Sequence, residues 1–220
     1  MGTERQMIQS IHRSAPRDYL ARMTAEKPLR VEIAKRFDRE FFDGDRANGY
    51  GGYRYDGRWK PIAQQLLRHY NLTEGARVLD VGCGKGFLLR DLREIRPDLG
   101  VRGLDVSPYA VDHAEEAVRD VVFVHDARRR LPFDDGAFDL VVSINTLHNL
   151  YLHEIVEALR EVARVGRQAY IVVESYRNEA EKFNLMCWNL TGECFFTPDE
   201  WRWVFATAGY AGDYEFIFFE

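Results

Sequence analysis

The sequence feature that most constrains this chain is an apolar run that passes directly into a glycine-rich turn, at residues 77–86, RVLDVGCGKG. Gly82, Gly84 and Gly86 let the backbone approach a ligand where side chains would collide. The residues that follow have the pattern of a helix, and a second apolar run ends at Asp105. An acid at the tip of the second strand of such a unit accepts hydrogen bonds from ribose hydroxyls, so the pattern predicts a site for a nucleotide-like cofactor.

The spacing of the glycines separates two kinds of cofactor. A dinucleotide site has the pattern G-x-G-x-x-G and holds a pyrophosphate at an open helix N-terminus. Here the third glycine comes one residue early, and Phe87 stands where the last glycine of that pattern belongs. Asp80 would repel a pyrophosphate but suits a cofactor that carries positive charge. A nicotinamide-dependent oxidoreductase is therefore an alternative against which the glycine spacing argues.

From residue 61 onward, strand-like and helical patterns alternate along the chain. We predict strands at 77–81, 101–105, 121–125, 138–144, 169–174 and 214–219, with helices near 86–96, 108–118, 151–164 and 198–208. Such alternation is typical of an α/β fold with a Rossmann-like, doubly wound, mostly parallel sheet that carries helices on both faces.

The residues before this alternation have a different pattern. Apolar side chains recur at every fourth position from Leu29 to Phe41, which predicts an N-terminal helical extension rather than a separate domain. Residues 44–59 have no periodicity and are dense in glycine, tyrosine and arginine. Such long loops are often lids or binding loops, and the alternative is a tight turn that packs its tyrosines on the N-terminal helices. We expect residues 1–60 and 61–220 to form one structural unit.

The pattern acid-x-G-x-G-x-G, which begins at Asp80, resembles motif I of the class I S-adenosylmethionine-dependent methyltransferases. Together with Asp105, the resemblance extends from about Val78 to the last residues. It implies the cofactor S-adenosyl-L-methionine, which carries an ammonium and a sulfonium, and a sheet that ends in an antiparallel pair of strands. Only eleven residues follow Gly209, so we expect the antiparallel C-terminal strand at 214–219 to have a very short partner or none.

The resemblance also implies a set of cofactor-binding residues. These are Asp80, Gly82, Cys83, Gly84, Gly86, Asp105, Val106, Tyr109, Asp126, Ala127 and Asn145. Asp80 would lie near the ammonium beside the glycine turn, Asp105 would hold the ribose, and Asn145 would lie near the sulfonium. Val106 and Tyr109 would lie near the adenine, whose amino group would donate to Asp126. The alternatives are that Asp105 begins a helix cap and that Asp126 neutralises the neighbouring arginines.

Three further residues are candidates for acid–base chemistry. Methyl transfer is an in-line displacement, so the protein mainly has to hold the nucleophile about 3 Å away and aligned. A base is needed when the acceptor is protonated, and His148 lies in the loop after the fourth strand, where open α/β sheets bind ligands. Glu174 and Tyr176 end the fifth strand at the same edge. The alternative for His148 is a helix cap or a surface position.

The tyrosines and arginines of residues 44–59 have chemistry that suits a cofactor or a substrate. We expect the ring of Tyr53 to shelter the sulfonium by cation–π attraction, worth about 1–2 kcal/mol when desolvated. Guanidiniums form paired, charge-assisted bonds with carboxylate and phosphate groups. The predicted substrate-binding residues are Tyr50, Arg54, Tyr55, Arg58 and Arg177.

Composition and charge restrict the partners. A net charge of -5 gives no long-range attraction to nucleic acid, and the three arginines at 128–130 are interpreted as a solvated loop face or a contact for an acidic substrate. The apolar runs are far shorter than the roughly 20 residues that cross a bilayer. The three cysteines form no C-x-x-C pair, which favours a reducing cytoplasm and argues against a disulfide framework or a metal site.

We therefore predict a cytoplasmic enzyme, a monomer or a homodimer, that acts on a small-molecule substrate and has no nucleic acid or membrane partner. It would transfer a methyl group from S-adenosyl-L-methionine to an oxygen, or alternatively a nitrogen, of a polar metabolite that is anionic or sugar-like. A non-catalytic S-adenosylmethionine-binding protein is the third hypothesis.

Overall fold

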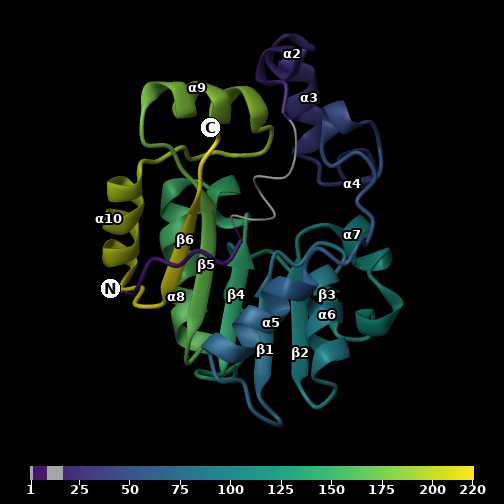
Figure 1. Cartoon of the computed structure of the whole chain (residues 1–220), viewed down its shortest axis with the longest axis vertical. Coiled ribbons are helices and arrows are strands. Elements are labelled where there is room, and N and C mark those ends of the chain that lie inside the picture. The colour runs from purple at the N-terminus through teal and green to yellow at the C-terminus, as the bar shows by residue number, and fades with distance from the viewer. Residues whose placement is uncertain (1, 9–16) are drawn as a thin grey trace.

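At the centre of the molecule lies a six-stranded sheet with the strand order β3-β2-β1-β4-β5-β6 (Figure 1). The computed structural model describes residues 2–8 and 17–220. The strands are β1 (Arg77–Val81), β2 (Gly100–Asp105), β3 (Val122–Val124), β4 (Leu140–Ile144), β5 (Ala169–Glu174) and β6 (Asp213–Ile217). Every neighbouring pair is parallel. The order reverses between β1 and β4, and in such sheets ligands bind beyond the carboxyl ends of the strands at that point.

Helices cover both faces of the sheet, as predicted. They are α5 (Lys60–His69), α6 (Phe87–Ile95), α7 (Pro108–Asp112), α8 (Leu152–Val165), α9 (Glu179–Trp188) and α10 (Pro198–Ala208), with the 3-10 turns η2 (Glu116–Val118) and η3 (Leu147–Asn149). Successive side chains of a strand point to opposite faces. Val78 of β1 accordingly belongs to the core formed with α5 and α6, whereas Leu79 belongs to the core formed with α8 and α10.

Residues 17–59, here called the cap, lie over the carboxyl edge of the sheet. The cap contains α2 (Tyr19–Thr24), α3 (Lys27–Ala34), α4 (Arg39–Phe42) and the 3-10 turn η1 (Arg46–Asn48). Figure 1 shows α2 to α4 and α9 above the sheet, on the side toward which the strands point. The ring of Tyr19 in α2 meets Trp188 in α9 edge to face, with 6.2 Å between centroids. Within the described residues, the predicted N-terminal extension is therefore helical, in the three short pieces α2, α3 and α4.

The prediction of an antiparallel C-terminal strand is wrong. β6 runs parallel to β5, with Tyr170 opposite Asp213, because α10 returns the chain from the carboxyl edge to the amino edge before β6 begins. Beyond β6 the chain does not reverse, and the Asn184 side chain donates to the carbonyl of Phe219. The outer edge of β6 pairs instead with residues 3–5, where Glu4 forms a parallel bridge with Tyr214. Those first residues carry no strand pattern, so the sequence did not indicate this pairing.

Two helical segments also differ from the prediction. The expected helix at 108–118 is broken into α7 and η2, and the backbone N–H of Glu115 between them donates to Lys85 in the glycine turn. α9 was not predicted, because its apolar side chains do not share one face: Leu185 is buried while Phe183 and Met186 are exposed. No helix in the described ranges is long and apolar enough to span a membrane.

Candidate active site

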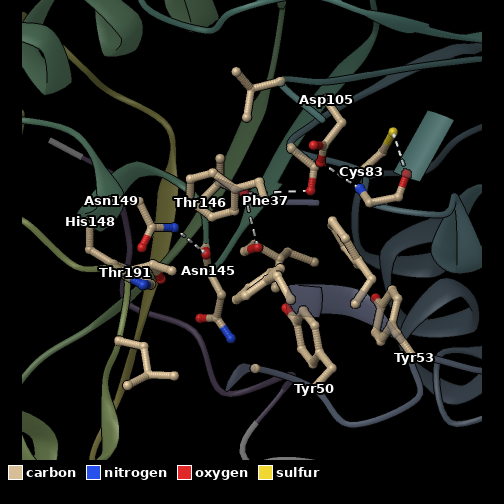
Figure 2. A pocket seen from close by; sticks show the side chains of 18 of the residues that line it. Phe37, Tyr50, Tyr53, Cys83, Asp105, Asn145, Thr146, His148, Asn149 and Thr191 are labelled. Atoms are coloured by element: carbon tan, nitrogen blue, oxygen red, sulfur yellow. Dashed lines mark hydrogen bonds between the residues drawn. The ribbon is translucent and has the colours of Figure 1, made fainter. Parts of the chain in front are cut away.

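A cavity of about 1160 Å³ lies at the carboxyl edge of the sheet, between the strand ends and the cap (Figure 2). Most of the predicted site residues line it. They are Tyr50, Tyr53, Arg54, Arg58, Asp80, Gly82, Cys83, Gly84, Asp105, Val106, Asp126, Ala127, Asn145, His148 and Glu174. Five predicted residues do not line it, namely Tyr55, Gly86, Tyr109, Tyr176 and Arg177.

The glycine turn after β1 forms the floor of the cavity. Gly82 and Gly84 have φ values of 82° and 53°, in the left-handed region that residues other than glycine rarely adopt. A Cβ on Gly82 would lie 2.1 Å from the Thr146 hydroxyl, so the turn packs closely on the loop after β4. A Cβ on Gly84 would meet the ring of Tyr53 at 3.4 Å. The turn thus offers bare backbone to the cavity, with Tyr53 of the cap above it.

Asp105, at the end of β2, is buried beside this turn. Its carboxylate accepts hydrogen bonds from the backbone N–H of Gly84 at 2.8 Å and of Ser107 at 2.9 Å. Burial raises the pKa of Asp105, and the backbone donors act in the opposite direction. Two carboxylate oxygens have about four acceptor positions, so lone pairs remain for a ligand. The N-cap of α7 is Ser107 rather than Asp105.

Asp80, in β1, is a buried carboxylate that has no partner among the described residues. It is 5% exposed, and no residue in the described part of the chain donates a hydrogen bond to it or pairs with it. Burial raises the pKa of Asp80 to about 7, with a smaller contribution from the charge of Asp105. Burying a carboxylate without a partner is costly. A cationic ligand in the cavity would relieve that cost.

The side of the cavity beyond β2 and β3 contains Val106, Asp126 and Ala127. Val106 is exposed toward the cavity (43%). Asp126 pairs with Arg128 at 2.7 Å, which lowers the pKa of its carboxyl. The interpretation that Asp126 neutralises a neighbouring arginine therefore describes this structure, although a lone pair can still face the cavity.

Tyr109 lies outside the cavity and fastens the cap to the sheet domain. Its hydroxyl donates to Asp43 at 2.7 Å, and the ammonium of Lys85 lies 2.6 Å from the same carboxylate. Lys85 also donates to the carbonyl of Tyr53 at 3.1 Å. Tyr55 serves a similar purpose, since its hydroxyl donates to Asp91 of α6. These hydrogen bonds and the ion pair connect the cap to the elements that follow β1 and β2.

Asn145, directly after β4, has a strained backbone. Its φ of 57° lies in the left-handed region, which is uncommon for a residue other than glycine and is concentrated at functional sites. The side-chain oxygen of Asn145 is buried, and no donor in the described part of the chain reaches it. Figure 2 shows Asn145 in the middle of the cavity wall. An orphaned acceptor at this position is available to a ligand.

His148 and Glu174 form a pair in the same cavity. His148, in η3, is 3% exposed, and its Nε2 lies 3.6 Å from Oε2 of Glu174 at the end of β5. The same oxygen accepts a hydrogen bond from the side chain of Asn189 at 2.5 Å. Burial lowers the pKa of His148, and the negative charge of Glu174 opposes that shift. The imidazole is therefore neutral near pH 7 and can accept a proton.

Tyr176 and Arg177 are placed differently from these two. Tyr176 is buried in the core on the α5 and α6 side, with the Lys182 ammonium 5.3 Å from its ring centroid. Arg177 pairs with Glu181 of α9 and with Glu220 at 2.7 Å. Both residues are close to Glu174 in the sequence. The chain leaves β5 after Glu174, however, and neither residue lines the cavity.

Several cavity residues were not identified from the sequence. They include Arg22, Phe37, Phe41, Arg46, Trp188, Asn189 and Thr191. Phe37 and Phe41 were recognised only as part of a helical stripe, and α9, which ends at Trp188, was not predicted. Phe37 does carry a structural signal, a φ of 48°, but the sequence does not reveal it.

The parallel sheet, the glycine turn and the cavity at the point where the strand order reverses define a Rossmann-like domain that binds a nucleotide-like cofactor. Residues 78–169 match the family model of a methyltransferase domain. This match and the fold support a class I S-adenosylmethionine-dependent methyltransferase. S-adenosyl-L-methionine is the cofactor of that family.

The chain is similar to curated methyltransferases and to solved structures. The demethylmenaquinone methyltransferase of Bacillus licheniformis is 28% identical over 151 residues, which cover 67% of this chain and 63% of that protein. The enzyme of the same name from Listeria welshimeri is 30% identical over 149 residues, which cover 65% of this chain and 60% of that protein. The chain thus spans a little under two thirds of the length of these relatives.

Among solved structures, one similar chain belongs to the complex between the Haloferax volcanii Trm112 methyltransferase activator and a methyltransferase. It has a TM-score of 0.53 and 27% identity, and the match covers 70% of this chain and 73% of that chain. The YcgJ protein of Bacillus subtilis has a TM-score of 0.54 and 21% identity, with 66% of each chain covered. The second similarity shows a shared fold.

Proposed function

We propose that the protein transfers a methyl group from S-adenosyl-L-methionine to an oxygen, with nitrogen as the alternative, of a small polar acceptor. The observation that supports this most directly is that one cavity holds both an unpartnered buried carboxylate, Asp80, and a neutral buried histidine, His148. The first suits a cationic cofactor, and the second suits an acceptor that must lose a proton.

The cofactor would be held mainly by backbone and carboxylates. Asp80 would pair with its ammonium, the bare backbone at Gly82 and Gly84 would line its methionine part, and Asp105 would accept from its ribose hydroxyls. Val106 and Ala127 would lie against the adenine. When bound, S-adenosyl-L-methionine supplies a methyl group that its sulfonium has already activated, so this chain needs no further group to activate the methyl donor.

The acceptor would be deprotonated by the pair of His148 and Glu174. The neutral imidazole takes the proton, and the carboxylate 3.6 Å away stabilises the imidazolium that results. The amide of Asn189 holds that carboxylate in place. The cap would restrict water, because its Tyr50 and Tyr53 rings stack on each other at 4.4 Å between centroids and Tyr53 stacks on Phe87 of α6 at 4.5 Å.

The decisive test is calorimetric titration with S-adenosylmethionine, S-adenosylhomocysteine and NADH. We expect the first two to bind with dissociation constants in the micromolar range, about -7 to -8 kcal/mol. Binding of NADH in their place would support an oxidoreductase. Binding of S-adenosylmethionine without turnover on any hydroxylated or amino acceptor would support a non-catalytic binding protein.

A second candidate acceptor follows from the relatives named for demethylmenaquinone. The rings of Phe37, Phe41 and Tyr50 line the cavity here, and aromatic walls favour an aromatic ring as substrate. A quinol ring is therefore the alternative to a polar metabolite. Assays with a short-chain demethylmenaquinol and with hydroxylated carboxylic acids, run under the same conditions, distinguish the two.

A further inference from the structure

Two arginines of the cap lie together at the outer part of the cavity. Arg22 of α2 and Arg46 of η1 both line the main cavity, and both also line a second depression of about 400 Å³ that adjoins it. Their guanidinium carbons lie 4.7 and 5.7 Å from the centroid of the Trp188 ring. Trp188 itself lines both spaces, so the three side chains separate the cavity from the depression.

Neither guanidinium has a carboxylate partner within the described residues. Arg22 donates to the carbonyls of Trp188 at 3.1 Å and of Arg46 at 2.6 Å, while Arg46 reaches only the carbonyl of Tyr50 at 3.4 Å. Asp18 lines the depression, but its carboxylate caps α2 through the N–H of Ala21 and forms no ion pair with Arg22.

Two exposed arginines of the cap, by contrast, have carboxylate partners. Arg39 pairs with Glu40 at 2.9 Å and Arg58 with Asp56 at 2.5 Å. The two arginines at Trp188 instead increase each other's electrostatic cost. Burial, together with the charge of Arg46, lowers the pKa of Arg22 to about 10. Two adjacent cations that face a cavity and lack an anion form a site for one.

We propose that Arg22 and Arg46 bind an anionic group, a carboxylate or a phosphate, of the methyl acceptor. This inference rests on the proposed function, because it places that group relative to the base. Trp188 contacts the arginines, and the next residue, Asn189, holds Glu174 beside His148. The anion site and the base are therefore linked by two consecutive residues. An acceptor that spans the cavity between them would place its anionic group at the arginines and its hydroxyl at His148.

The test uses the full chain saturated with S-adenosylhomocysteine and three probes of similar shape. The probes are 4-hydroxybenzoate, 4-hydroxyphenyl phosphate and the neutral 4-hydroxybenzamide, and binding is followed by NMR on the indole N–H signal of Trp188. We expect the anionic probes to bind the wild type at least about tenfold more tightly than the amide, since hydrogen bonds to charged groups are the stronger ones. The ratio of the affinities for the first two probes distinguishes a carboxylate site from a phosphate site.

Arg46→Gln and Arg22→Gln should each reduce the preference for anions to about threefold or less, whereas Arg46→Lys should retain part of it. Arg39→Gln is the matched control, because Arg39 is an exposed cap arginine that does not line the cavity. Arg22 also ties α2 to α9, so Arg46, which is exposed and has one weak backbone contact, decides the outcome if Arg22→Gln fails to fold.

The proposal is overturned if wild type binds the charged and neutral probes equally, if no anionic probe binds, or if Arg46→Gln keeps the full preference. Failure of S-adenosylhomocysteine to bind wild type is a different result, which contradicts the proposed function itself. A preference for anions that survives in protein free of S-adenosylhomocysteine would support the arginine site alone.

Discussion

The two sides of the cavity are built in different ways. Most of the cofactor side comes from one stretch of chain, from Asp80 to Ala127, and is fixed largely by backbone, as in the bond from Gly84 to Asp105. The acceptor side brings together Tyr50, His148 and Asn189, which lie in the cap, in the loop after β4 and beyond α9. A strand–turn–helix unit can specify the first side locally. The second side exists only when distant elements pack.

The largest expected effect is on the acceptor side. His148→Ala should lower turnover by about 10²- to 10⁴-fold, because the acceptor's proton then has no base. Affinity for S-adenosylhomocysteine, measured by calorimetry, should stay nearly unchanged. His153→Ala is the control, since that histidine is exposed and outside the cavity. Equal activity of the two variants would mean that His148 is not the base and has a structural role.

The pH profile of turnover refines this assignment. Burial lowers the pKa of His148, so the rate should fall only as the pH drops below the ordinary range of a histidine. Glu174 raises that pKa, and Glu174→Gln should therefore shift the acidic limb of the profile to still lower pH. An acidic limb that does not move would mean that Glu174 does not influence the pKa of His148.

On the cofactor side, the next largest effect is expected at Asp105. Asp105→Ala should weaken cofactor binding by about 2–3 kcal/mol, because contacts between ribose hydroxyls and a charged acceptor are lost. Asp105→Asn controls for shape, since the amide oxygen still accepts from the N–H of Gly84. Calorimetry with S-adenosylhomocysteine measures both variants. An unchanged affinity in the alanine variant would show that Asp105 does not bind the ribose.

The third prediction concerns pH and Asp80. Because burial raises the pKa of Asp80 to about 7, the neutral carboxyl predominates below that pH in the free protein. Cofactor affinity should therefore fall as pH falls, approaching about tenfold per pH unit well below pH 7. Above about pH 8 the amino group of the ligand loses its own proton, so titrations belong between about pH 5.5 and 7.5. In Asp80→Asn this dependence should disappear.

The smallest effect is expected at the hydrogen bond that connects the cap to the sheet domain. Tyr109→Phe removes one hydrogen bond to Asp43 and should lower the free energy of unfolding by about 1 kcal/mol. Amide exchange over residues 44–59 should slow when S-adenosylhomocysteine binds, and less so in this variant, if that segment acts as a lid. Tyr176→Phe is the matched control and should leave amide exchange over residues 44–59 unchanged. Slow exchange in the free protein would instead indicate a fixed wall.

The cofactor side could be predicted from the sequence because its information is local. Three glycines at fixed spacing require a turn with left-handed backbone at Gly82 and Gly84, and the acid at the end of the next strand must then face that turn. The doubly wound parallel sheet followed in the same way from the alternation of short patterns. These features depend on backbone geometry, which short stretches of residues determine.

The rest was decided by packing between distant segments. Glu174 and Tyr176 look equivalent in the sequence, yet only Glu174 reaches His148, because the chain leaves β5 directly after it. β6 is parallel because a helix, rather than a hairpin, precedes it. The cap places Arg22 and Arg46 against Trp188, more than a hundred residues away. No local pattern encodes such contacts, since side chains from separate elements meet only after the sheet and its helices have packed together.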